Sequence, residues 1–170
     1  VIGPLNVAAN YVDRISKGDI PPKITDTYNG DFNTIKNNLN TAIDAVNQLV
    51  ADAVMLAQAA VEGRLQTRAD ATKHQGDFGR IVQGVNNTLD AVIGPLNVAA
   101  DYVDRIAKGA IPARITDTYN GDFNTLKNNL NTAIDAVNGL VADAVMLAQA
   151  AVDGRLATRA DASKHQGAYR

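Results

Sequence analysis

The fold is decided by residues 31–62, which read DFNTIKNNLNTAIDAVNQLVADAVMLAQAAVE. Apolar residues recur in this stretch at alternating steps of three and four, and neither proline nor glycine interrupts it. The resulting seam consists of Phe32, Ile35, Leu39, Ala42, Val46, Leu49, Ala53, Leu56 and Ala60. This spacing is typical of a helix that packs on other helices. We therefore predict one continuous helix, about 50 Å long at about 1.5 Å per residue.

Two further segments, residues 77–108 and 122–153, have the same apolar period, so the sequence predicts an all-α fold. Pro95 lies inside the first of them. Because proline has no N–H to donate and clashes with the preceding turn, we predict a kink or a break near Ile93. The seam of the first segment is also widened on one flank by Ile43, Val50 and Ala57. That width favours a four-helix arrangement over a two-stranded coil.

The chain contains a tandem duplication. The phrase VIGPLNVAA begins at Val1 and again at Val92, and residues 1–79 and 92–170 differ at 13 of 79 positions, so 66 are identical. A weaker repeat of about half that length lies inside each copy. In it the helical interval is always 33 residues, from Gly30 to Gly63, from Gly76 to Gly109 and from Gly121 to Gly154. The connectors between these intervals vary in length, which is expected if the helices must keep their rotational phase and the connectors need not.

Each connector begins with a glycine, and we predict that Gly18 and Gly63 cap the helices that precede them. Pro21 and Pro22 then predict an extended path. Every connector also has two apolar residues four positions apart, namely Ile20 and Ile24, Leu65 and Ala69, Ile111 and Ile115, and Leu156 and Ala160. We expect these pairs to anchor the connectors on the helices.

Composition excludes several classes of function. The 16 Lys and Arg residues are balanced by 18 Asp and Glu residues, which argues against broad binding of nucleic acid. Cysteine is absent, so disulfides, thiolate chemistry and cysteine-based zinc sites are excluded, and a cytoplasmic location is compatible with this absence. No run of 18 apolar residues occurs, which predicts no membrane span in this chain. We take the chain to be part of a longer protein.

Catalytic and metal-binding motifs are weak. His74 and His165 are the only histidines, and one histidine per repeat makes no ligand set, so we interpret both as polar connector residues. Residues 77–79 spell the magnesium-binding triplet of kinases, but no Gly-rich phosphate loop or catalytic-loop motif accompanies it. We therefore expect no cofactor, no metal site and no enzymatic activity in this chain.

The order of helix, glycine-led connector with two apolar anchors, and second helix opening near a glycine resembles the HAMP domain. HAMP domains are signal-relay modules of bacterial receptors, histidine kinases and cyclases. The resemblance covers the whole chain. The chain is similar to the tandem HAMP arrays of chemoreceptors and sensor histidine kinases. This resemblance implies parallel four-helix coiled coils formed by two chains, stacked in tandem and joined by continuous helices of about 33 residues. The implied partners are a second copy of the chain and the sensor and output domains of the parent protein.

The resemblance divides the chain into module 1 (residues 1–47), module 2 (48–92), module 3 (93–138) and module 4 (139–170), the last without its second helix. It also implies structural relay residues. The proline near the start of the first helix matches Pro4 and Pro95, and the connector anchors match the four pairs named above. In the family a glycine opens the second helix and a core residue follows it. The corresponding pairs in modules 1–3 are Gly30 and Phe32, Gly76 and Phe78, and Gly121 and Phe123. The asparagine seven positions after that glycine matches Asn37 and Asn128, with Gln83 at this position in module 2.

Module 2 has Leu49 where modules 1 and 3 have proline, so two module types alternate. An asparagine-rich patch on or beside the seam, Asn33, Asn37, Asn38 and Asn40, is either a solvated face or a set of polar groups that lets two helix packings compete. We expect the chain to be a signal relay. The alternatives are a passive coiled-coil spacer or dimerisation scaffold, and a monomeric solenoid that binds a partner peptide.

Overall fold

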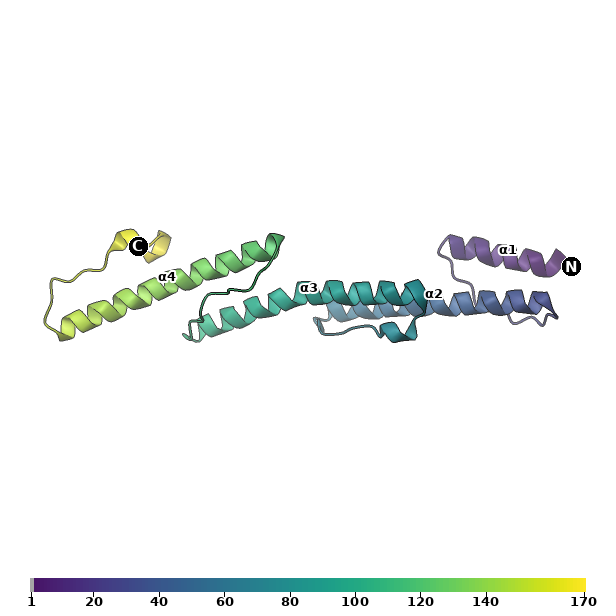
Figure 1. Ribbon diagram of the computed structural model, residues 1–170, viewed down its shortest axis with the longest axis horizontal. Helices are drawn as coiled ribbons and strands as arrows, with labels where there is room; N and C mark the ends of the chain where they lie inside the picture. The colour runs from purple at the N-terminus through teal and green to yellow at the C-terminus, as the bar shows by residue number, and fades with distance from the viewer. Residues whose placement is uncertain (1) are drawn as a thin grey trace. The chain divides into compact units, whose positions relative to one another are not determined.

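The computed structural model describes residues 2–170, and within that range the chain is helical and contains no strand (Figure 1). The long helices are α1 (Ile2–Ser16), α2 (Asp31–Val61), α3 (Gly76–Ala107) and α4 (Gly121–Val152). Short 3-10 turns follow at η1 (Ala71–Lys73), η2 (Ala162–Lys164) and η3 (Gly167–Tyr169). The predicted all-α class is confirmed, and α2 and α4 begin and end within one residue of the predicted segments.

The predicted break near Ile93 is wrong. Helix α3 stays continuous from Gly76 to Ala107 with Pro95 inside it. The carbonyl that Pro95 leaves without an N–H partner belongs to Ala91, four residues earlier, and Ala91 is exposed. Water can therefore take the place of the missing donor, which keeps the helix intact at a modest cost. The milder alternative, a kink, stays a prediction.

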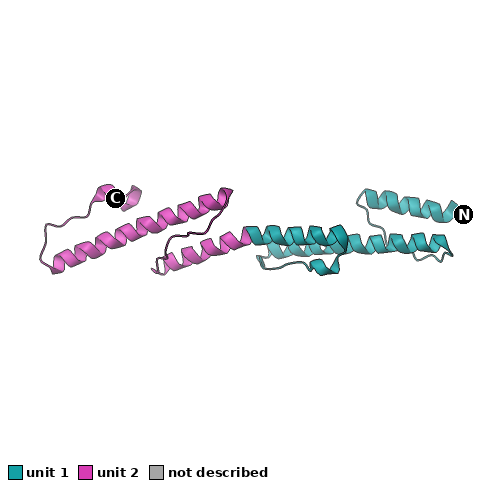
Figure 2. Cartoon of the chain, viewed as in Figure 1, with its two compact units in different colours: residues 1–91 teal, residues 92–170 magenta. Residues whose placement is uncertain are grey.

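The described chain divides into two compact units, residues 1–91 and residues 92–170 (Figure 2). The division falls at Val92, where the second copy of the duplicated phrase begins, so each unit holds one copy of the long repeat. The finer module boundaries predicted after residues 47 and 138 fall inside α2 and α4 and stay predictions.

Within unit 1 the helices pack in parallel pairs. Pro4 near the start of α1 lines a small cavity together with Phe32 and Leu39 near the start of α2. The second half of α2 pairs in the same way with the first half of α3, because residues 49–60 and residues 81–89 line one groove. Each connector therefore runs back along its helix pair before the next helix begins, as Figure 1 shows.

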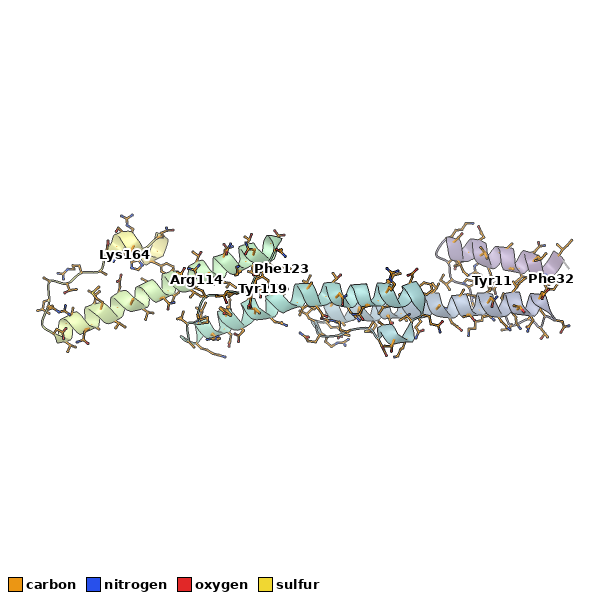
Figure 3. The ribbon with its side chains drawn as sticks, viewed as in Figure 1. Tyr11, Phe32, Arg114, Tyr119, Phe123 and Lys164 are labelled. Carbon is orange, nitrogen blue, oxygen red and sulfur yellow. The ribbon has the colours of Figure 1, made fainter. Side chains whose placement is uncertain are left out.

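Unit 2 repeats this arrangement. Pro95 and Val98 of α3 line a small cavity with Phe123 and Leu130 of α4, so these helices are also parallel. Figure 3 labels Tyr119, in the connector just before α4, and Phe123, in the first turn of α4, and both line the cavity with α3. After α4 the chain continues as a further connector that contains η2 and η3.

The predicted helix caps at Gly18 and Gly63 are confirmed. The N–H of Gly18 donates to the Ile15 carbonyl and the N–H of Asp19 donates to the Arg14 carbonyl, both at 3.0 Å. This pair of bonds is the Schellman motif, which requires a left-handed residue at the position of the glycine. The φ angle of Gly18 is 79°, and the same two bonds recur at Gly63, Gly109 and Gly154. All four modules therefore end their first helix in the same way.

The core of the single chain is thin. Besides Pro21 and Pro112, the buried apolar residues of the described range are Ile24, Ile43, Ala59, Ala69, Val82, Ile93, Ile115, Ile134 and Ala150. Many larger apolar side chains stay exposed on the helices, including Val50, Ile81 and Val85. A chain that leaves this much contiguous apolar surface open is typical of one that associates with another molecule.

Helix α4 contains an 18-residue window with a mean hydropathy of 1.3, which is apolar and long enough to cross a membrane by length and composition alone. Only 11% of that window is buried. Helix α2, its near copy, differs mainly by Gln48 where α4 has Gly139, so the two helices have almost the same apolar face. The expectation that this chain has no membrane span stays a prediction.

Candidate functional site

In modules 1–3 an asparagine holds the connector on the second helix of the module. In module 3, Oδ1 of Asn131 accepts from the N–H of Ile115 at 2.7 Å, and Nδ2 of Asn131 donates to the Ile115 carbonyl at 3.0 Å. In module 1, Asn40 makes the same two bonds with Ile24, at 2.8 and 3.0 Å. We call this two-bond arrangement the asparagine clamp.

Module 2 has the same clamp, in which Asn86 accepts from the Ala69 N–H at 3.2 Å and donates to the Ala69 carbonyl at 2.8 Å. The side-chain amide offers one acceptor and donors in a fixed geometry, which matches the N–H and C=O of a single extended residue. Asn86 and Asn131 are buried, so without the clamp these backbone groups would lose water and gain no partner. Within the described residues no buried side-chain polar atom is left unpaired.

Sequence reasoning assigned a role to Asn37 and Asn128, but both are exposed, and the structure gives neither side chain a hydrogen bond. The clamp residues lie three positions later. A signal for them was present in the sequence, because an asparagine stands ten positions after every opening glycine, at Asn40, Asn86 and Asn131. At the seven-position site module 2 has Gln83 instead. Of the asparagine-rich patch, the structure thus gives Asn40 a specific partner.

The predicted connector anchors divide into two groups. The second anchors of modules 1–3 are buried, at Ile24, Ala69 and Ile115, and Ala160 of module 4 is half-buried. Among the first anchors, Ile20 and Ile111 are half-buried, whereas Leu65 and Leu156 remain exposed on the single chain. The clamp explains the difference, because it fixes the second anchor directly and leaves the first anchor to depend on packing alone.

The remaining predicted relay residues lie near the helix starts. Gly30, Gly76 and Gly121 open α2, α3 and α4 with φ angles of 54°, 55° and 53°, a conformation that other residues rarely adopt. The residues Pro4, Pro95, Phe32, Phe78 and Phe123 are all half-buried on helix faces. The structure therefore brings the prolines and phenylalanines to the contacts between paired helices in modules 1 and 3.

Modules 2 and 4 contain a hydrogen bond between a histidine and an aspartate that sequence reasoning missed. Nε2 of His74, at the end of the module 2 connector, lies 2.6 Å from Oδ2 of Asp52 on α2, and the His74 side chain is only 1% exposed. His165 and Asp143 of module 4 make the same contact at 2.7 Å. We call these two contacts the polar junctions. The histidines are thus more than polar connector residues, and the 22-residue spacing from Asp to His, present twice, was the available signal.

Modules 1 and 3 fill the same position with apolar and aromatic side chains. Val7 and Tyr28 line one small cavity in module 1, and Val98 and Tyr119 line its counterpart in module 3. We call these contacts the apolar junctions. The pKa of Tyr28 is raised, first by burial and then by its hydrogen bond to the Asp26 carboxylate at 3.2 Å. Tyr28 therefore stays neutral well above neutral pH.

A salt bridge ties each of the three complete connectors to the same face of the second helix. The bridges are Lys23 to Asp44 at 2.6 Å, Arg68 to Asp90 at 2.6 Å and Arg114 to Asp135 at 2.9 Å. Arg68 has the most buried cation, and it also donates to the carbonyls of Leu65 and Thr67, at 2.8 and 2.7 Å. Exposed bridges contribute little, so we expect the clamp to dominate the attachment of each connector.

The short 3-10 turns of the polar-junction modules begin with capping aspartates. The carboxylate of Asp70 accepts from the hydroxyl and the N–H of Thr72, at 2.6 and 3.0 Å, and these bonds lower the pKa of Asp70. The carboxylate of Asp161 accepts the same two bonds from Ser163, which lower the pKa of Asp161 as well. The turn places His74 and His165 directly after it.

An apolar groove of about 550 Å³ runs between α2 and α3 of unit 1. Leu49, Leu56, Ile81 and Leu89 are among its lining residues, and Asp52 is the only charged one. Within residues 2–170 no cluster of three or more His, Cys, Asp or Glu side chains could hold a metal ion. The groove therefore offers an apolar packing surface and not a polar chemical site.

A sequence model of the HAMP domain family matches residues 1–48 and 73–139. No solved structure matches the chain. The matched ranges include both residues of the clamps of modules 1 and 3 and Asn86 of module 2, whereas Ala69 lies in residues 49–72, which together with residues 140–170 are outside the match. The unmatched ranges contain Asp52 and the complete polar junction of module 4.

Proposed function

Because the chain belongs to the HAMP domain family, we propose that it is a signal-relay module built as a parallel homodimer. HAMP domains generally relay signals in sensor proteins. In this proposal two copies of the chain lie side by side and form four-helix coiled coils, one for each module. A conformational change enters at one end of the array and passes along it to a downstream output.

The observation that carries the proposal is the open apolar groove of unit 1. Val50, Ile81 and Val85 line it and are 50%, 51% and 42% exposed on the single chain. A second copy offers the same apolar surface, and in a symmetric dimer the two grooves would cover each other. The helix pairs are already parallel within one chain, as a parallel four-helix bundle requires.

Relay along the array is supported by the continuity of the helices. Helix α2 includes the second helix of module 1 and the first helix of module 2 without interruption, and α3 joins module 2 to module 3 in the same way. A rotation or shift of one module therefore acts directly on the next. The clamps and salt bridges fix each connector at a few points only, which leaves the thin core free to repack.

The rest of the proposal concerns the parent protein. Sensor domains would supply the input, and a kinase or a kinase-controlling chemoreceptor domain would receive the output. The array would lie in the cytoplasm, carry no cofactor and catalyse no reaction itself. A passive spacer that only sets distance and dimer register is the competing function, and the second experiment below separates the two.

The dimer is tested by cross-linking, since the chain has no native cysteine. Ala57 lines the groove, whereas Ala51 is exposed on the opposite side of α2. We expect Ala57→Cys to form a disulfide with its counterpart in a parallel dimer, and Ala51→Cys to remain a free thiol. Sedimentation should show a dimer for both. A monomer at micromolar concentration, or equal cross-linking of both variants, would overturn the proposed dimer.

Relay is separated from spacing by changing the phase of α2. One residue inserted after Val46 rotates the following part of the helix by about 100°, whereas seven residues nearly restore the phase. In the parent protein we expect the single insertion to change the output strongly and the seven-residue insertion to change it little. If neither insertion alters the output, the array is a passive spacer.

A further inference from the structure

We propose that modules 1 and 3 each carry a site of spontaneous covalent modification, at which an asparagine loses its side-chain amide and becomes aspartate or β-linked aspartate. The two residues are Asn29 and Asn120, the last residues of their connectors. Each is followed directly by a glycine, Gly30 or Gly121, that opens the second helix of the module.

The reaction needs only the chain and water. The backbone nitrogen of the glycine attacks the side-chain amide carbon of the asparagine before it, a C–N bond forms, and the amide group leaves as ammonia together with the glycine proton. Water then opens the resulting cyclic imide at either carbonyl, which gives aspartate or β-linked aspartate. Glycine hinders the attack least, because it has no Cβ beside the reacting nitrogen.

The structure leaves the reacting groups free at both sites. Asn29 and Asn120 are exposed, and the Asn120 side chain makes no capping hydrogen bond to α4. The N–H groups of Gly30 and Gly121 stand at helix openings, where the helix itself offers no acceptor, and no other backbone carbonyl of the described residues accepts from them. The attack therefore requires no backbone hydrogen bond to break.

A third Asn-Gly pair, Asn138 and Gly139, provides a comparison inside the same chain. This pair lies in the interior of α4, where the N–H of Gly139 belongs to the ladder of helical hydrogen bonds. Asn138 is exposed like Asn29 and Asn120, so exposure does not separate the three sites. The backbone separates them, because attack within α4 requires the helix to open locally first.

Modules 2 and 4 do not have the site. Gln75 precedes Gly76, and Gln166 precedes Gly167. The extra methylene of glutamine makes the cyclic imide a larger ring, which forms more slowly. The φ angles of Gly76 and Gly167 are 55° and 56°, compared with 54° at Gly30, so glutamine is compatible with the same backbone turn.

The product would act on the apolar junctions. Tyr28 comes just before Asn29 and lines the small cavity of module 1, and Tyr119 has the same place in module 3. A β-linked aspartate adds a methylene to the main chain between this tyrosine and the helix that follows. The modification therefore changes the spacing between junction and second helix in modules 1 and 3, and leaves the polar junctions unaltered.

The test is peptide mapping by mass spectrometry of the whole chain after incubation at mildly alkaline pH. Replacement of the amide by a carboxyl group changes the mass, and chromatography separates aspartate from β-linked aspartate. In the folded chain we expect Asn29 and Asn120 to convert at least about tenfold faster than Asn138. In urea, which removes the helix, the three rates should agree within about threefold.

The matched control is the double variant Asn29→Gln/Asn120→Gln, which introduces the residue that modules 2 and 4 have and should remove both products. The proposal is overturned if Asn138 converts as fast as Asn29 and Asn120 in the folded chain. It is also overturned if folding slows Asn29 and Asn120 by about tenfold or more relative to urea, since the connector would then protect them. The comparison within the unaltered chain decides the matter even if the variant does not fold.

Discussion

Module 1 closes the contact between its first helix and its connector with Val7 and Tyr28, whereas module 2 uses Asp52 and His74 at the same place. Both residues of the contact change between the two modules. The same change of both residues is found between module 3, with Val98 and Tyr119, and module 4, with Asp143 and His165. Helix caps, clamps and salt bridges are otherwise shared by modules 1 and 2. One backbone arrangement thus accepts either an apolar or a charged contact, provided that both members are exchanged.

The two module types also differ at the start of the first helix, and here we expect the largest effect. Module 3 has Pro95 where module 2 has Leu49. Leu49→Pro should cost about 3 kcal/mol more than Leu49→Ala, because proline removes a hydrogen bond and clashes inside α2. Pro95→Ala should instead stabilise α3, by roughly 1 kcal/mol or more. Urea denaturation of the three variants measures these differences, and equal losses for Leu49→Pro and Leu49→Ala would contradict the expectation.

The next largest loss of stability should come from removing the asparagine clamp, which both module types share. Asn131→Leu should cost roughly 2 to 3 kcal/mol, because the N–H and C=O of Ile115 would be buried without partners. Asn86→Leu should cost a similar amount in module 2, despite its different junction. The exposed Asn128→Leu is the matched control and should change the free energy of unfolding by less than about 0.5 kcal/mol. A similar loss for Asn128→Leu and Asn131→Leu would show that the clamp does not hold the connector.

These expectations also show how far the sequence alone could lead. The period of apolar residues predicted α2 and α4 to within a residue, because it is a local property, and in α2 the absence of proline and glycine supported the same prediction. The continuity of α3 was missed, because the cost of Pro95 depends on whether water reaches the carbonyl of Ala91. That exposure is set by packing and cannot be read from the residue types.

The clamp and the junctions were harder to predict for a different reason. Asn40 and Ile24 are 16 residues apart, and Asp52 and His74 are 22 apart, so their contacts depend on the path of the connector. The repeated sequence contains the signal, but only if the modules are compared by position and by residue pair. The family resemblance assigned a role to Asn37, which stays a prediction, whereas the bonds of Asn40 to the connector could be found only once the path of the connector was known.

The next largest change in stability should come from replacing the polar junction of module 2 with the apolar junction of module 1. His74→Tyr alone leaves the Asp52 carboxylate beside an aromatic ring and without its partner, which should cost about 2 kcal/mol. Adding Asp52→Val should recover most of that loss, because the pair then matches Val7 and Tyr28 of module 1. A double-mutant cycle in urea denaturation measures the coupling. Additive effects would mean that the two positions do not form one contact and would remove the basis for distinguishing module types.

The smallest loss of stability should come from removing the salt bridges. This experiment tests whether the connectors of the two module types are held with different strength. Arg68→Ala in module 2 removes a cation that is 23% exposed and that also binds two connector carbonyls, whereas the Lys23 side chain is 52% exposed. We expect a loss of roughly 1 kcal/mol for Arg68→Ala and less than about 0.5 kcal/mol for Lys23→Ala. Raising the salt concentration should reduce the Lys23 effect further and leave most of the Arg68 effect, because hydrogen bonds to carbonyls are screened less than an exposed ion pair. If both losses were equally sensitive to salt, the carbonyl bonds of Arg68 would contribute nothing, and the connectors of the two module types would be held with the same strength.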